Sequence, residues 1–313
     1  MKLFKPKFWQ SNNRFFPILL LPLTCIVILY IFLKKTFRKK KNCSIPVVCV
    51  GNIYIGGTGK TPLSIHLAKE VEKKGKKPAI IRKYYKAHGD EHNLITNYFE
   101  NLFLEKNRLK AIDNAYKKSH DIAILDDGLQ EYQIKKDLSI VCFNEKQFIG
   151  NGFVIPSGPL RERLNALRDA HIVIINGEKN TKIEKKILKY NENLEIYYSR
   201  YHPLNLDDLK KKPVVALAGI ANPNNFFELI EKNNINITQK LVYPDHYQFS
   251  KKEISKLVEN LKRKNFQIIM TEKDFFKIKD YNIPDINFLK VRLIINDQDK
   301  LIKRIMKLYD KTI

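Results

Sequence analysis

The chain has 313 residues, with 57 Lys and Arg against 33 Asp and Glu, giving a formal net charge of +24. A chain of this length can bury a full core and can hold one large α/β domain or two lobes. Its four cysteines show no C-x-x-C spacing, so the fold does not depend on a disulfide framework, and a reducing compartment fits the composition.

The positive charge raises three kinds of partner: nucleic acid, an anionic membrane and an acidic substrate. Ten Lys and Arg residues and no Asp or Glu fall within the first 41 residues, which therefore carry +10 of the +24. This excess lies beside one apolar segment, and no RNA- or DNA-binding motif occurs elsewhere. We therefore expect no nucleic-acid partner, and no pattern implies a protein partner.

An uncharged run of 19 residues extends from Phe15 to Leu33. As a helix it would measure about 28 Å, close to the thickness of a bilayer core. We expect residues 1–41 to form a membrane-anchoring helix with basic flanks. Pro17 and Pro22 leave open a helix that lies in the membrane interface, and a buried core helix or a cleaved signal are further alternatives. The basic stretch 34–41 argues against cleavage, and it would attract anionic headgroups.

A phosphate-binding loop is the clearest chemical signal. The β-branched run 45–50 predicts a buried strand, apolar spacing over 63–74 predicts a helix, and a glycine-rich loop joins them. Glycines let backbone N–H groups surround phosphate oxygens, a lysine reaches the β- and γ-phosphates, and a hydroxyl can ligate Mg²⁺. Tyr54 replaces the first glycine of the strict motif. The expected ATP-binding residues are Gly56, Gly57, Thr58, Gly59, Lys60 and Thr61.

Carboxylates follow two further predicted strands. The run 121–126 ends in Asp126 and Asp127, which, with Thr61, are the expected Mg²⁺ ligands at the carboxyl edge of a parallel sheet. The strand 78–81 leads into a loop, residues 82–91, that contains cations and an acid pair. A kinase acting on an alcohol uses a carboxylate near the γ-phosphate, so Asp90 or Glu91 is a candidate base.

Strand-like and helical runs alternate through the rest of the chain, which predicts an α/β fold of the P-loop NTPase type with a mostly parallel sheet flanked by helices. The polar tract 177–212 is the expected connection between lobes. The predicted domains are the anchor 1–41, a P-loop core lobe 42–176, the connection 177–212 and a second α/β lobe 213–313.

Several sequence blocks occur in the order found in the tetraacyldisaccharide 4'-kinase family, which phosphorylates the lipid A disaccharide precursor. The resemblance covers nearly the whole chain. The blocks are Gly51-Asn52, Gly56-Gly57-Thr58-Gly59-Lys60-Thr61-Pro62, Gly89-Asp90-Glu91, Asp126-Asp127-Gly128-Leu129-Gln130, Gly158-Pro159-Leu160-Arg161-Glu162, Ala218-Gly219-Ile220-Ala221, Tyr243-Pro244-Asp245-His246-Tyr247 and Thr271-Glu272-Lys273-Asp274.

The resemblance implies transfer of the γ-phosphate of ATP to the 4'-hydroxyl of a tetraacyl disaccharide 1-phosphate. It implies that Asp90 is the catalytic base assisted by His246, with Lys60 at the phosphates. Expected substrate contacts are Glu91, Arg161 and Gln130. It also implies two lobes joined by a hinge, the second lobe closing on the active site.

The implied partners are an acidic glycolipid and the anionic surface of a bacterial inner membrane. Six basic residues follow the apolar segment and four precede it, which places the catalytic domain on the cytoplasmic side.

Two departures from the family pattern concern the site. Glu131 stands where the family usually has His, and Leu129 where it has an aromatic residue, while the loop 82–86 lacks two glycines. These changes affect metal geometry and the shape of the substrate loop. The principal alternative is a membrane-tethered P-loop NTPase that works as a switch or motor. It predicts ATP hydrolysis without a lipid acceptor and gives no role to Asp90 or His246.

Overall fold

The structure, a computed structural model, describes residues 6–11, 13–85, 89–210 and 212–311. The chain packs into two compact units, each described here by itself. The large unit comprises the described residues of 5–84, 99–200 and 295–313, and the small unit those of 85–98 and 201–294.

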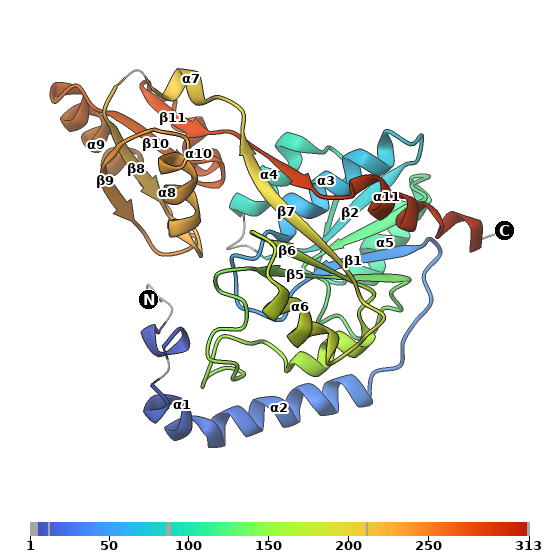
Figure 1. The fold of residues 1–313 in the computed structure, drawn as a ribbon. Helices are drawn as coiled ribbons and strands as arrows, with labels where there is room; N and C mark the ends of the chain where they lie inside the picture. Colours follow the sequence, from blue (N-terminus) through green and yellow to red (C-terminus); the bar gives the residue numbers. More distant parts are fainter. Residues whose placement is uncertain (1–5, 12, 86–88, 211, 312–313) are drawn as a thin grey trace. The chain divides into compact units, whose positions relative to one another are not determined.

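In the large unit, the strands and helices alternate along the chain (Figure 1). Its helices are η1 (Lys7–Trp9), α1 (Phe15–Leu19), α2 (Leu21–Thr36), α3 (Lys60–Glu72), α5 (Arg108–Lys117), η3 (Leu164–Asp169), α6 (Thr181–Leu188), α11 (Gln298–Met306) and η5 (Tyr309–Lys311). Its strands are β1 (Val47–Gly51), β2 (Pro78–Lys83), β3 (Leu102–Glu105), β4 (Ile122–Asp126), β5 (Leu138–Asn144), β6 (Ile172–Asn176) and β7 (Glu195–Pro203), of which the last three residues belong to the small unit.

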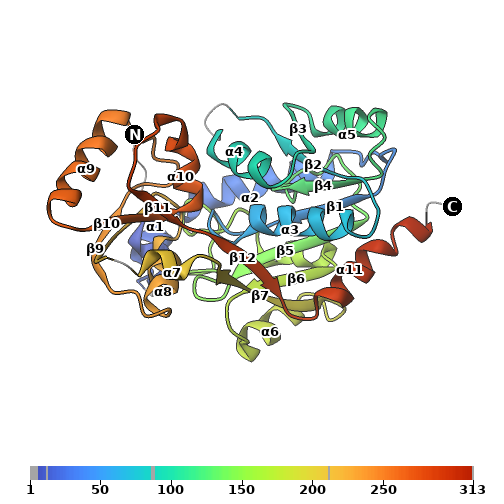
Figure 2. The same ribbon diagram turned by 90° about the horizontal axis from the view of Figure 1, so that it is seen from above.

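These strands form a sheet in the order β12-β7-β6-β5-β1-β4-β2-β3, where β12 is Val291–Ile295. Every pairing from β7 through β3 is parallel. Strands β1, β4 and β5 are buried along their whole length, as expected for β-branched runs covered on both faces. Helix α3 packs on β1, β4 and β2 (Figure 2). The α/β fold with a mostly parallel sheet is thus confirmed.

Two hydrophobic clusters form much of the core of the large unit. In one cluster, Ala111, Ile112 and Ala115 of α5 pack against alternate residues of β1, β2 and β4. In the other, Ile183 and Ile187 of α6 pack against residues of β5 and β6 together with Val27, Ile28 and Ile31 of α2. One side of α2 is therefore part of this core.

The apolar N-terminal segment does not form the single spanning helix expected over residues 15–33. Helix α1 ends at Leu19 and α2 begins at Leu21, with Leu20 capping both. Pro22 lies in the first turn of α2, where its missing N–H is tolerated but where it cannot continue α1. Helix α2 has 16 residues, or about 24 Å, and Lys34 and Lys35 lie in its last turn. Within the ranges that the structure describes, no helix has the length and apolar content required to cross a membrane.

The small unit contains a second, four-stranded sheet in the order β11-β10-β8-β9, with all pairings parallel. Its strands are β8 (Val214–Ala218), β9 (Ile237–Val242), β10 (Gln267–Thr271) and β11 (Ile286–Leu289). Its helices are α4 (Gly89–Tyr98), α7 (Leu206–Leu209), α8 (Pro223–Glu231), α9 (Lys251–Arg263), α10 (Glu272–Ile278) and η4 (Lys279–Tyr281).

The boundaries between units differ from those drawn from the sequence. The tract 177–212 contains α6 and β7, because its apolar residues alternate with Lys and Glu and pack on the large sheet. Residues 295–311 return to the large unit, where α11 packs on α3. Helix α4 packs on α10 of the small unit, although its sequence lies within the predicted core lobe. Residues 89–91, expected in a loop, are the first turn of this helix.

Candidate functional site

The phosphate loop of the large unit depends on three glycines. Gly56, Gly57 and Gly59 have φ values of 71°, 62° and 86°, a left-handed region that side chains disfavour. Gly59 is the N-cap of α3, so the helix begins at Lys60. The free N–H groups of its first turn and the positive end of its dipole therefore face the loop, which is the arrangement that binds phosphate.

Two buried side chains stabilise the loop through contacts with the core. The Asn52 amide donates a hydrogen bond to the Thr58 hydroxyl at 2.7 Å. Tyr54, at the position where the strict motif has glycine, is fully buried and its hydroxyl accepts a bond from Gln10 at 2.5 Å. Burial raises the pKa of Tyr54, so this hydroxyl stays neutral. The variant residue thus supports the loop from within the core rather than lining it.

Asp126, at the end of β4, contacts three polar side chains near the phosphate loop. It is fully buried, accepts a hydrogen bond from Thr61 at 3.1 Å and one from Ser64 at 3.0 Å, and pairs with the Arg82 guanidinium. Arg82 is itself buried and lies at the carboxyl end of β2, the neighbour of β4 in the sheet. Parallel strands end at one edge, so β1, β2 and β4 deliver their polar residues to the same place.

These groups fit a magnesium ion by the chemistry of the donors. Magnesium prefers hard oxygen ligands and in nucleotide sites takes few from the protein, the rest coming from phosphate and water. The Thr61 hydroxyl and an Asp126 carboxylate oxygen supply two such oxygens side by side. Over the described ranges, no group of three or more His, Cys, Asp or Glu side chains is placed to hold a metal by itself.

Asp127 lies among cations rather than beside Thr61. Its backbone is left-handed, with φ at 55°, and its carboxylate lies 2.8 Å from Arg161 and 3.6 Å from Lys60. Burial by itself raises the pKa of Asp127, but the charges of Lys60 and Arg161 outweigh it and hold the pKa well below its usual range. Burial lowers the pKa of Lys60, with Asp127 opposing it. The Asp127 carboxylate and the Lys60 ammonium therefore each favour the charged form of the other, beside the loop where a phosphate would bind.

Gln130, Arg161 and Glu162 form a polar chain next to Asp127. Arg161 donates to the Gln130 carbonyl oxygen at 3.3 Å, and the Gln130 amide donates to Glu162 at 2.7 Å. Thus the structure places Arg161 and Gln130, expected at the substrate, against the phosphate loop and Asp127.

Glu131, the departure from the family's usual His, pairs with Arg108 at 3.6 Å. The buried Arg108 also donates to the backbone carbonyl of Asp127 at 2.8 Å. The Glu131 side chain therefore holds a cation that braces the end of β4.

In the small unit, Asp90 and His246 lie in contact. The His246 Nδ1 atom is 2.9 Å from Asp90 Oδ2 and 3.1 Å from Oδ1, and the Asp90 side chain is completely buried. His246 has a left-handed backbone, φ 58°, a conformation held where the surroundings determine it. Glu91 lies at 3.3 Å from Lys273. Sequence reasoning placed Asp90 and His246 together only through the family resemblance, since 156 residues separate them.

Several charged residues of the site were missed. Arg82, Arg108 and Lys277 are three among 57 Lys and Arg residues, so composition gives them no emphasis. Arg82 directly follows a predicted strand, and the four-residue spacing of Lys273 and Lys277 places both on one face of a helix. These two positional signals were present in the sequence.

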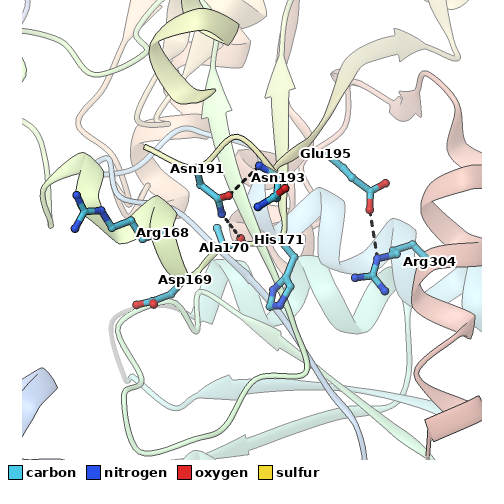
Figure 3. Close-up of a pocket in the computed structure, with 8 residues that line it drawn as sticks. All are labelled: Arg168, Asp169, Ala170, His171, Asn191, Asn193, Glu195 and Arg304. Atoms are coloured by element: carbon cyan, nitrogen blue, oxygen red, sulfur yellow. Dashed lines mark hydrogen bonds and ion pairs between the residues drawn. The ribbon is translucent and has the colours of Figure 1, made fainter. Parts of the chain in front are cut away.

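A separate cavity of about 400 Å³ lies at the amino ends of β6 and β7, the opposite edge of the sheet from the phosphate loop (Figure 3). Its polar groups bond to one another: the Asn191 amide donates to Ala170, Asn193 donates to Asn191, and Arg304 pairs with Glu195. None of the predicted site residues lines it.

Comparisons with known proteins agree with this geometry. A family model described as tetraacyldisaccharide-1-P 4'-kinase matches residues 16–310. The tetraacyldisaccharide 4'-kinase of Pelagibacter ubique is 40% identical, covering 99% of this chain and 100% of its own length. That of Rickettsia akari is 33% identical, with 98% of each chain covered. The crystal structure of LpxK from Aquifex aeolicus in complex with ATP matches with a TM-score of 0.72 at 24% identity, covering 93% of this chain and 99% of that one.

A parallel sheet that ends in a glycine loop, a lysine and a buried strand-end aspartate defines a P-loop nucleotide-binding protein. The family model and the relatives match nearly the whole length of the chain, and they identify the family within that class. The chain belongs to the tetraacyldisaccharide 4'-kinase family.

Proposed function

We propose that this protein transfers the γ-phosphate of ATP to the 4'-hydroxyl of a tetraacyl disaccharide 1-phosphate, giving the bis-phosphorylated lipid A precursor, lipid IVA. The relatives named above carry this activity in their names. The observation that carries the proposal within this chain is the buried Asp90–His246 pair, because a nucleotide switch has no use for a hydroxyl-activating carboxylate.

The large unit supplies the nucleotide site. Backbone N–H groups of residues 56–59 and the Lys60 ammonium bind the β- and γ-phosphates, and Arg161 balances the charge of the transferring group. Thr61 and Asp126 are the residues that would hold Mg²⁺, which neutralises phosphate charge when bound. The Asp127 carboxylate favours the charged form of Lys60 and so opposes the effect of burial.

The small unit supplies the acceptor chemistry. Asp90 orients the sugar hydroxyl and takes its proton as the new oxygen–phosphorus bond forms and the bond to the departing ADP oxygen breaks. His246 holds the carboxylate in one orientation through Nδ1. The Asp90 carboxylate has no water-exposed surface, so its orientation is set by these contacts.

The proposal is tested by incubating detergent-solubilised protein with labelled ATP and the tetraacyl disaccharide 1-phosphate. We expect label in the lipid for the wild type and for Lys256→Met, which changes an exposed lysine of α9. Lys60→Ala and Asp90→Asn should each reduce transfer by at least about 100-fold. Hydrolysis of ATP at equal rates with and without lipid, unchanged in Asp90→Asn, would instead identify a switch or motor.

We further propose that α1 and α2 bind the cytoplasmic surface of a bacterial inner membrane without crossing it. The two helices expose large apolar side chains on the side away from the core, among them Phe15, Leu19, Ile26 and Phe32, each more than 60% exposed. The basic residues 34–41 follow directly. An apolar face beside a cationic segment is typical of an interfacial helix on anionic lipid.

Flotation with vesicles containing anionic phospholipid tests this second proposal. The wild type should float with the vesicles, and Ile26→Asp should shift most of the protein to the unbound fraction. Asn114→Asp, at an exposed polar position of α5, introduces the same charge outside these helices and serves as the control. Equal flotation of all three proteins would contradict the assignment of this face.

A further inference from the structure

The buried Asp90 carboxylate faces two lysines of α10 as well as His246. Lys273 Nζ lies 3.4 Å and Lys277 Nζ 3.8 Å from Asp90 Oδ2. All of these residues belong to the small unit, and α4 and α10 pack directly on each other. The carboxylate is therefore surrounded by positive charge on the side of α10.

Lys277 is the more firmly held of the two lysines. Its side chain is only 1% exposed, and its ammonium group donates to Asp274 Oδ1 at 2.6 Å and to the Gly219 carbonyl at 3.3 Å. Asp274 is also fully buried, and it accepts hydrogen bonds from the Gly219 N–H at 2.8 Å and the Thr271 hydroxyl at 2.6 Å. A network of hydrogen bonds therefore fixes the Lys277 charge in place.

Lys273 is placed differently. Its side chain is 16% exposed, and its ammonium lies at similar distances from three carboxylates, Asp90 at 3.4 Å, Glu91 at 3.3 Å and Asp245 at 3.5 Å. Its charge is shared, and solvent reaches it. Among the described carboxylates, the ion pairs of Lys277 are with Asp274 and Asp90.

A role as the counter-ion of Asp274 does not by itself explain why Lys277 is buried here. A buried ion pair needs further compensation to offset its desolvation, and an apolar pair is often as stable. The geometry adds a second carboxylate, Asp90, whose Oδ2 lies 3.8 Å from the same ammonium. From this we infer that Lys277 is a positioning residue for phosphate transfer, anchored by Asp274, which fixes the charge and place of the Asp90 carboxylate.

This inference rests on the proposed kinase function and deepens it. The charged groups that face Asp90 from its neighbours are Lys273 and Lys277 of α10 and His246 of the 243–249 loop, with Glu91 and Asp245 nearby. Without Lys277, a buried carboxylate keeps one shared lysine and the histidine, so its charged form is less favoured and its position less fixed. We expect substrate binding to be unaffected, because the Lys277 side chain is only 1% exposed.

The experiment compares the full-length wild type with Lys277→Met, the double variant Asp274→Asn/Lys277→Met, and Lys256→Met as an exposed-lysine control. The double variant removes both charges of the buried pair, so its unfolding midpoint should recover from the loss caused by Lys277→Met alone. Lys277→Gln, which removes the charge but keeps a donor for Asp274, is a second route to a folded protein. Phosphate transfer to the lipid is expressed per ATP-binding site, which counts folded molecules.

We expect kcat to fall about tenfold in the double variant and in Lys277→Gln, with KM for ATP and lipid within about twofold of the wild type. The inference is overturned when the double variant regains stability and also wild-type kcat, because Lys277 is then only the counter-ion of Asp274. If the wild type transfers no phosphate to the lipid, the proposed function itself is wrong. This outcome is seen in the wild-type assay, before any variant is compared.

Discussion

Arg82 and Asp126 show how much a single buried pair contributes to the nucleotide site. The Arg82 side chain is 6% exposed and that of Asp126 is not exposed at all. The guanidinium also approaches the Thr61 hydroxyl at 3.4 Å. Thus one cation supports both the strand-end aspartate and the first turn of α3, where the expected magnesium ligands lie.

Replacing Arg82 with Ala should destabilise the protein by about 3–5 kcal/mol, because it leaves the Asp126 charge buried without its partner. Urea unfolding measures the loss. The matched control is Lys35→Ala, which breaks the exposed pair with Asp169 and should cost about 0–1 kcal/mol. Similar losses for both variants would mean that the buried pair is solvated.

The pH dependence of stability should report Asp90. Burial by itself raises the pKa of Asp90, but the His246 hydrogen bond and the Lys273, His246 and Lys277 charges outweigh it, so the folded-state pKa lies below the ordinary value of 3.8. A carboxyl group with a depressed folded-state pKa stabilises the fold above its unfolded-state pKa and loses this contribution as pH falls.

We therefore expect the difference in unfolding free energy between wild type and Asp90→Asn to shrink as the pH falls below about 4. Urea unfolding at a series of pH values measures it. The change Asp280→Asn, at an exposed position, serves as the control. A difference for Asp90→Asn that grows on acidification would reverse the sign assigned to its pKa.

At the scale of elements, local motifs were readable and long-range packing was not. Strand, glycine loop and helix around Lys60 follow one another in the sequence, so their geometry could be predicted. Helix α4 could not, because Gly89 and the short polar run after it gave a weak helical pattern and the surface that holds it, α10, lies far along the chain. The break at Leu20 was signalled by Pro22, but the core contacts of α2 were not.

Helix α2 is attached to the core by a polar contact as well as by apolar packing. The buried Thr24 hydroxyl donates to the Ser157 hydroxyl at 2.7 Å and accepts from the Ser157 N–H at 3.1 Å, and Ser157 in turn donates to the Pro17 carbonyl at 2.8 Å. This contact sets which side of α2 faces inward and therefore which side stays exposed.

Thr24→Val keeps the shape but removes the hydroxyl that accepts from the buried Ser157 N–H, so we expect a loss of about 1–3 kcal/mol in unfolding free energy. Thr36→Val is the control, because the Thr36 hydroxyl is exposed and bonds only within α2, to Phe32. Denaturant unfolding followed by Trp9 fluorescence measures both variants, since Trp9 donates to Pro156 next to the same contact. Equal stability of the two variants would mean that water replaces Thr24.

At the scale of the whole chain, the alternation of strands and helices predicted the α/β class, and the apolar runs located most strands. Unit boundaries could not be predicted in the same way. The chain leaves the large unit at residue 85, returns at 99, leaves again at 201 and returns at 295. Such crossings leave no compositional mark, because those at residues 201 and 295 fall within single strands, β7 and β12.

ATP should stabilise the folded protein by linkage, since the unfolded chain has no phosphate loop. At an ATP concentration about 100 times the Kd, we expect an increase of about 2.7 kcal/mol in unfolding free energy. Denaturant unfolding with and without ATP and Mg²⁺ measures it. Lys60→Ala should lose the increase and Lys256→Met should keep it, whereas an equal increase in both would place nucleotide binding away from the loop.

The position of helix α4 in the sequence also determines when during synthesis the Asp90–His246 pair can form. Asp90 emerges from the ribosome 156 residues before His246, and α10 follows later still. At about 5–20 residues per second, the newly made helix waits on the order of ten seconds for the surface that will receive it. Its exposed Asn93, Thr96 and Asn97 suit a segment that must remain in water meanwhile. The nascent protein thus acquires its phosphate loop early and its paired acid and histidine only when most of the chain has emerged.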